Sequence, residues 1–170
     1  MIKFFKIIFF FSFSFFVNNS AYAELNIMYI DLDYIVSNSN PGKKLFEDLK
    51  NRENLKINEL KEKEKKLKNE ENKILGSKNL ISEDQLKIDI ENFQKKLADY
   101  KTYNKNEIDK LQNKRNDEVK NLLNTINSII ETYMDENSIS IILDKKNIYI
   151  AHKKYDITEK LIELINKNIK

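Results

Sequence analysis

The chain holds few side chains whose types and spacing could form a catalytic site. His152 is the only histidine and no cysteine is present, so His152 lacks the convergent partners that a site needs and is interpreted as a solvated loop residue. Asp31 and Asp33 could share a metal ion, but a strand end followed by a helix N-cap at Asp33 is the simpler explanation. No glycine-rich loop could cradle a phosphate, and no nucleophile has a candidate base. The sequence therefore predicts no enzymatic activity, no metal site and no cofactor, and nothing in it requires ATP.

With catalysis excluded, the remaining candidate functional residues are those that could bind another polypeptide chain reversibly. They lie in a long charged stretch without helix breakers after Pro41-Gly42. Its apolar residues fall on a seven-residue spacing, with Glu53 at the one step that is not apolar: Phe46, Leu60, Leu67 and Ile74. Three residues on from each step only Leu49 is apolar, whereas Lys56 and Lys63 are charged. A coiled coil needs both positions of each heptad apolar, so this seam is incomplete. Such a surface can hold partly apolar clients weakly and release them.

A second and longer helix is predicted from about residue 83 to residue 135. Its seam steps by four and three residues near both ends: Leu86, Ile90, Phe93, Leu97 and Tyr100, then Leu122, Ile126, Ile129 and Tyr133. Asn104 and Arg115 occupy seam positions between these runs, so we expect loose packing there. A helix of this length spans roughly 80 Å at ~1.5 Å per residue. We therefore predict an arm, residues 43–135, that projects from a body.

The turn between the two helices is marked by their expected caps. Gly76 follows the last apolar pair of the first helix, as a C′ residue does. Ser82 and Gln85 form a capping box for the second helix. The tip of the arm is therefore expected near residues 76–82.

Both ends of the chain return to strand patterns. Residues 25–32 are apolar on both faces, which suits a short buried strand. Residues 139–143 and 148–151 are two β-branched runs around a polar turn, which predicts a β-hairpin. A short amphipathic helix should follow Asp156. The expected fold class is α+β, predominantly α, in which a long coiled-coil helical hairpin is inserted into a small β-rich oligomerisation body, residues 24–42 and 136–170.

That body has only 54 residues, without disulfides or metal, and is marginal as an independent fold. We therefore expect an obligate oligomer that associates through the strands. The candidate residues for this association are Ile27, Tyr29, Ile141, Leu143, Ile148 and Ile150.

The first 23 residues have the layout of a cleavable secretory signal. Lys3 and Lys6 precede an apolar run over residues 7–17, and Ala21-Tyr22-Ala23 supplies the small-x-small pattern before the cleavage point. Without this segment the chain carries 28 basic and 27 acidic residues. This balance lacks the concentrated basic face of a nucleic-acid binder, so no nucleic-acid partner is predicted.

The candidate client-binding residues are the apolar side chains that the incomplete coil does not fully use. They are Leu60, Leu67, Ile74, Leu86, Phe93 and Tyr100. The alternative is that these side chains only hold the two helices together.

The mature chain resembles the Skp/OmpH family of periplasmic chaperones. The most specific likeness is in residues 141–151 and in Tyr155-Asp156-Ile157-Thr158, supported by residues 27–31 and 39–43. The resemblance implies a periplasmic homotrimer whose helical arms surround a cavity for unfolded outer-membrane proteins, without ATP. Well-known relatives are strongly basic, whereas residues 43–135 carry 21 basic and 19 acidic side chains. A transient contact with a membrane surface stays open, and so does the alternative of a structural coiled-coil spacer or adaptor in the envelope.

Overall fold

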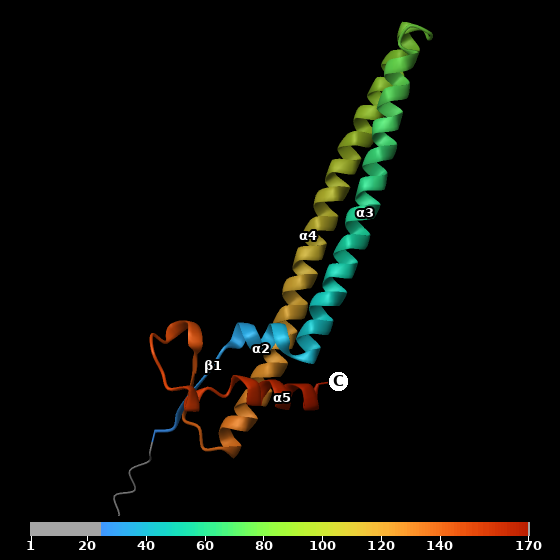
Figure 1. Cartoon of the computed structure of the whole chain (residues 1–170). Coiled ribbons are helices and arrows are strands. Elements are labelled where there is room, and N and C mark those ends of the chain that lie inside the picture. The colour runs from blue at the N-terminus through green and yellow to red at the C-terminus, as the bar shows by residue number, and fades with distance from the viewer. Residues whose placement is uncertain (1–24, 170) are drawn as a thin grey trace, which may run out of the picture.

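A computed structural model describes residues 25–169, and the expected signal at residues 1–23 lies outside them. Two long helices lie side by side and project from a small body at one end (Figure 1). The helices are α3, Asn40–Ser77, and α4, Glu83–Glu136. The body contains β1 (Ile27–Ile30), α2 (Leu32–Asn38), β2 (Ile141–Asp144), the short 3-10 helices η2 (Lys145–Asn147) and η3 (Lys153–Tyr155), and α5 (Thr158–Asn168). The predicted architecture, a helical hairpin on a body with a small β element, is confirmed.

The arm helices begin at serine N-caps. The Ser39 hydroxyl accepts a hydrogen bond from the Gly42 N–H, and the Ser82 hydroxyl accepts one from the Gln85 N–H. Pro41 stands in the first turn of α3, where its missing N–H costs no helical hydrogen bond. At ~1.5 Å per residue, α3 and α4 are roughly 57 and 81 Å long. The extra length of α4 carries it from the arm into the body.

The body core forms where α2 and α5 pack on the last turns of α4. Its buried members are Ile30, Ile35, Val36, Ile126, Ile130, Leu161, Ile162 and Ile165. β1 and β2 pair in parallel, with Ile27 opposite Ile141 and Ile30 opposite Asp144. Thr158 ties the strand to α5, because its hydroxyl accepts from the Asp31 N–H and donates to Asp156. The arm is therefore anchored through one small core.

The predicted strand at residues 148–151 is wrong. The sheet of the described chain has only two strands, and residues 148–151 form a loop between η2 and η3. The Asp144 carboxylate ends β2 by accepting from the Lys146 N–H and pairing with the Lys146 ammonium. β2 takes β1 as its partner, so no antiparallel hairpin forms. The single-chain body is thus mostly helical and not β-rich.

Four details of the helix ends also differ from the predictions. The α3 helix begins at Asn40 and not at residue 43, because Ser39 caps it ahead of Pro41. Gly76 lies inside α3 with a helical φ, so it is not a C′ residue. Asp31, not Asp33, caps α2 by accepting from the Tyr34 N–H. The Gln85 side chain donates to Asp89, so it does not close the predicted capping box.

Candidate functional site

The six predicted client-binding residues all lie along the arm. Leu60 is buried, with 5% of its surface exposed. The other five are half-buried: Leu67, Ile74, Leu86, Phe93 and Tyr100. Leu67 of α3 and Tyr100 of α4 line an open hollow of about 360 Å³, together with Lys66 and Lys96. These side chains therefore contribute to the contact between the helices, and five of them also present part of their surface to solvent.

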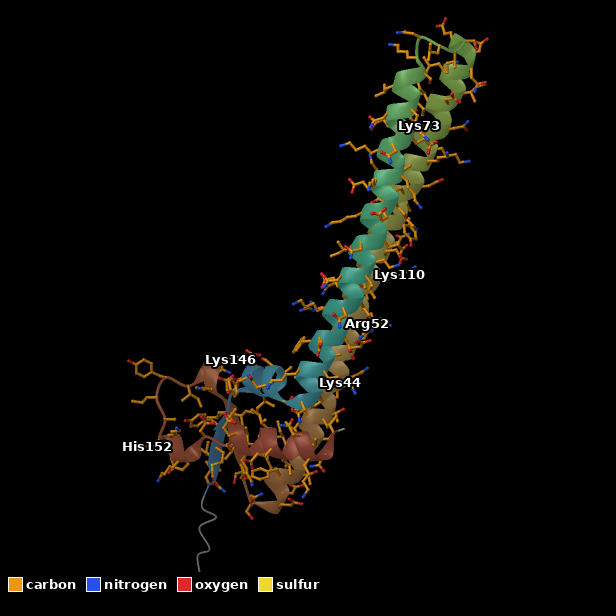
Figure 2. The ribbon with its side chains drawn as sticks, turned by 45° about the vertical axis from the view of Figure 1, so that its right-hand side comes forward. Lys44, Arg52, Lys73, Lys110, Lys146 and His152 are labelled. Carbon is orange, nitrogen blue, oxygen red and sulfur yellow. The ribbon has the colours of Figure 1, made fainter. Side chains whose placement is uncertain are left out.

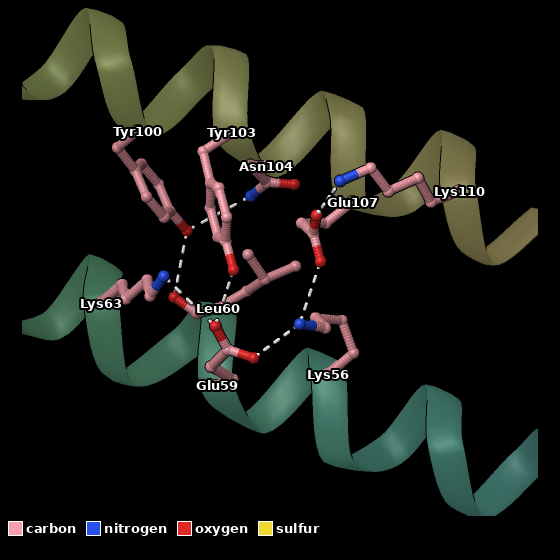
Figure 3. Close-up of polar contacts among 9 residues, drawn as sticks. All are labelled: Lys56, Glu59, Leu60, Lys63, Tyr100, Tyr103, Asn104, Glu107 and Lys110. Carbon is pink, nitrogen blue, oxygen red and sulfur yellow. Dashed lines mark hydrogen bonds and ion pairs between the residues drawn. The ribbon is translucent and has the colours of Figure 1, made fainter.

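A polar network crosses the middle of the arm (Figure 3). The Tyr100 hydroxyl donates to the Leu60 carbonyl at 3.1 Å, and the Tyr103 hydroxyl donates to Glu59 at 2.8 Å. Asn104, a predicted interruption of the seam, donates to the Tyr100 hydroxyl at 3.2 Å. The tyrosines therefore connect α4 to α3 at a level where the apolar seam is weak.

Lys56 is the charged centre of this network. Its ammonium lies 2.7 Å from Glu59 on α3 and 3.0 Å from Glu107 on α4. Lys63 also contacts Glu59, at 3.2 Å, and lies 3.7 Å from the centre of the Tyr103 ring. The predicted interruptions Lys56 and Lys63 are thus paired with polar groups of both helices.

These contacts shift the titration of the carboxyl groups. Hydrogen bonds from Lys56, then Tyr103 and Lys63, lower the pKa of Glu59 to about 2. Lys110 and Lys56 lower the pKa of Glu107. The pKa of Lys56 is raised, first by Glu59 and then by Glu107. All three groups are therefore charged at neutral pH and hold the helices together electrostatically.

Closer to the body, ion pairs between side chains of the two arm helices flank a gap in the packing. Arg52 makes a two-bond pair with Glu118, at 2.7 and 2.6 Å. Arg115 approaches Glu53 only to 4.0 Å. A small void of about 90 Å³ lies between the helices here, lined by Leu49, Leu111 and Arg115, among others. The void is at the level where Arg115 breaks the seam, as loose packing requires.

Several exposed apolar residues of the arm were missed by the seam analysis. They are Leu55, Leu75, Leu80 and Ile88. Ile88 stands midway between the seam residues Leu86 and Ile90, so helical periodicity turns it away from the partner helix. An apolar residue at such an outward position was the signal that could have identified them.

The predicted oligomerisation residues gather around one groove of the body. Ile27, Tyr29, Leu143, Ile148 and Ile150 line a hollow of about 770 Å³ between the sheet and the loop over residues 148–151. Ile141 is exposed on the neighbouring strand. Tyr149, within the loop, is fully exposed. The body of a single chain therefore leaves much of its apolar surface uncovered.

Of the residues first considered for chemistry, His152 directly follows this loop as the N-cap of η3. It lies in the body, apart from the labelled charged residues of the arm (Figure 2). Within residues 25–169, no group of three or more His, Asp or Glu side chains is placed to hold a metal ion. Over the same residues, no helix combines the length and apolar character needed to cross a membrane.

Comparisons with known proteins agree with this arrangement. A crystal structure from Caulobacter crescentus, described as that of a candidate outer membrane chaperone (OmpH-like), superposes with a TM-score of 0.80 at 19% identity, over 85% of this chain and 86% of the other. This likeness shows a shared fold. No protein of curated function matches the chain in sequence. The profile of the family described as "Outer membrane protein (OmpH-like)" matches residues 26–165. The chain therefore belongs to the OmpH-like family.

Proposed function

We propose that this protein is a periplasmic holding chaperone that keeps unfolded outer-membrane proteins from aggregating, without ATP and without catalysis. The observation that carries the proposal is the arm itself, a helical hairpin whose incomplete seam leaves apolar side chains partly uncovered far from the body. Family membership and the description of the structural neighbour as a candidate outer membrane chaperone support it. The signal-like residues 1–23 support export.

We further propose that three copies associate through their bodies. The apolar groove beside β1 and the free edge of β2 are surfaces that a second copy could cover, because a strand edge offers unpaired N–H and C=O groups. Three arms around one axis would then enclose a space for a client. The bound client would meet many weak contacts at once, which raises the overall affinity.

The client surface in this proposal is the half-buried apolar line of the arm: Leu67, Ile74, Leu86, Phe93 and Tyr100. Leu60 belongs to the same line, but its burial gives it mainly a packing role. Each partly exposed contact supplies about 1 kcal/mol or less by area. Weak contacts of this size allow a client to be released without an energy source.

Aggregation of a urea-diluted β-barrel outer-membrane protein, followed by light scattering, tests the function. The mature chain should suppress scattering equally with and without ATP, and sedimentation should give a mass of three chains. Phe93→Ser should weaken the suppression, whereas Asn92→Ser, at the exposed neighbouring position, should not. A trimer that leaves aggregation unchanged would instead support a structural spacer.

A further inference from the structure

Four large aliphatic side chains are exposed at the far end of the arm. They are Leu75, Leu80, Ile88 and Ile90, with exposed fractions of 64, 83, 51 and 40%. Leu80 lies in the turn between the helices, and the other three lie within about 11 Å of the helix ends at ~1.5 Å per residue. Exposed apolar side chains that gather in one region of a surface are a mark of an interaction site.

The arrangement of these side chains is a collar and not one flat face. Ile88 and Ile90 are two residues apart on α4, so at 3.6 residues per turn they point about 200° apart. Leu75 adds apolar surface from α3, and Leu80 adds it at the end. A collar suits a flexible chain that can wrap around it better than a flat, rigid surface.

The charge of this end indicates which chain fits. We define the arm tip as residues 71–92. It contains three lysines, Lys73, Lys78 and Lys87, and five acidic residues, Glu71, Glu83, Asp84, Asp89 and Glu91. The net charge of the arm tip is therefore −2. Within residues 25–169 none of these eight side chains forms an ion pair. Below the tip, by contrast, Lys96 pairs across the arm with Glu70 at 2.6 Å.

A negatively charged, unpaired tip disfavours two of the possible occupants. An anionic membrane would repel it, and so would the identical tip of a second copy. An extended polypeptide segment with an apolar centre and basic flanks matches both the collar and the charge.

We infer that the arm tip is a capture site for extended apolar segments of an unfolded polypeptide that carry Lys or Arg at their flanks. This inference rests on the proposed holding function and assigns it a first point of contact. Glu83 and Asp84 also stabilise the N-terminus of α4. Glu71 and Glu91 have no such role and are the residues to change.

The test uses fluorescence anisotropy to measure how two fluorescent peptides bind the full mature protein. The two peptides share the same apolar core, which is flanked by Lys in one peptide and by Glu in the other. The Lys peptide should bind the parent several-fold more tightly at low salt, and salt should reduce the difference. The triple variant Leu75→Ser/Leu80→Ser/Ile88→Ser should weaken binding of the Lys peptide by roughly 10-fold. Leu55→Ser, an equally exposed position in mid-arm, should change it less than about 2-fold on the same reasoning.

The charge-reversed variant Glu71→Lys/Glu91→Lys leaves the helix caps intact and should reverse the preference between the two peptides. Equal binding of both peptides by this variant and the parent would overturn the inference. So would tip-dependent binding of anionic phosphatidylglycerol vesicles, or tip-dependent association beyond the parent's mass. If the parent suppresses client aggregation but the triple variant binds peptides equally well, only the tip inference fails. If the parent does not suppress aggregation at all, the proposed function fails. The peptide measurements then decide separately whether the arm tip binds apolar segments with basic flanks.

Discussion

Replacing Leu60 by alanine separates a packing role from a client-binding role for the centre of the arm. Leu60 keeps only 5% of its surface exposed and sits at the level of the Tyr100 and Tyr103 contacts. Leu55, five residues earlier on the same helix, has the same side chain but is 71% exposed. The pair therefore holds residue type and helix constant and varies only burial.

The expected cost follows from that burial. Truncating a buried leucine in a compact core costs about 2–5 kcal/mol, and less where the neighbours can close the gap. Two helices can approach each other more freely than the walls of a core, so about 2–3 kcal/mol is expected for Leu60→Ala. For Leu55→Ala the lost burial is small and alanine is the better helix former, so the change should be about zero.

Hydrogen exchange read by mass spectrometry measures this locally. Opening of residues 56–64 and 96–104 should become roughly 30- to 150-fold more frequent in Leu60→Ala, since every ~1.4 kcal/mol is tenfold. The body peptides containing Ile35 and Leu161 should keep their protection and serve as the internal control. Equal exchange in the Leu60 and Leu55 variants would refute the reasoning. Loss of client holding with unchanged exchange would instead make Leu60 a contact residue.

Three further perturbations test the ion pairs and the backbone. Lys56 and its neighbours lower the pKa of Glu59 from 4.5 to about 2 in the folded arm. The contribution of Glu59 to stability is therefore complete above about pH 4.5 and is lost as the pH falls toward 2. Helicity of the arm, followed by circular dichroism, should fall over that pH window, and it should fall less in Glu59→Gln. A double-mutant cycle with Arg52→Met and Glu118→Gln should give a favourable coupling energy that shrinks with added salt, and an additive cycle would show that the pair contributes nothing. Gly42→Ala should destabilise the body by about 2 kcal/mol or more, because a Cβ there would overlap the Val36 carbonyl. At Gly76 an added Cβ meets no atom, so Gly76→Ala should stabilise the helix by up to about 1 kcal/mol. Thermal unfolding of the two variants measures both changes.

The long elements could be predicted from the sequence because their signals are local. The Ser82 N-cap and the apolar steps from Leu86 to Tyr100 place the start and the inner face of α4 without reference to any other segment. The same local rules failed where the conformation of a segment depends on which other segment it pairs with. Residues 148–151 have strand composition, but a strand needs a neighbour, and β2 had already paired with β1.

The candidate site was predictable in outline only. A heptad pattern identifies which side chains face the other helix, and the six predicted residues do lie buried or half-buried along the arm. It does not give the register between the helices, because Lys56, Lys63 and Asn104 leave the seam without a continuous apolar match. The Tyr103–Glu59 and Arg52–Glu118 contacts depend on that register and were therefore not predicted. The apolar tip was missed because attention to seam positions excludes residues such as Ile88.

The parallel pairing of β1 and β2 has a consequence for the order in which the chain folds. Ile27 meets Ile141 across 114 residues of sequence, so the pairing must close a long loop before it gains any contact. The helices of the arm need only neighbouring residues and a short turn, so they can form before the later segments of the chain are available. The body waits for β2 and α5, which come last. The chain can therefore complete its arm before its body, and only a copy whose C-terminal segment is in place can offer the surface on which the proposed assembly would depend.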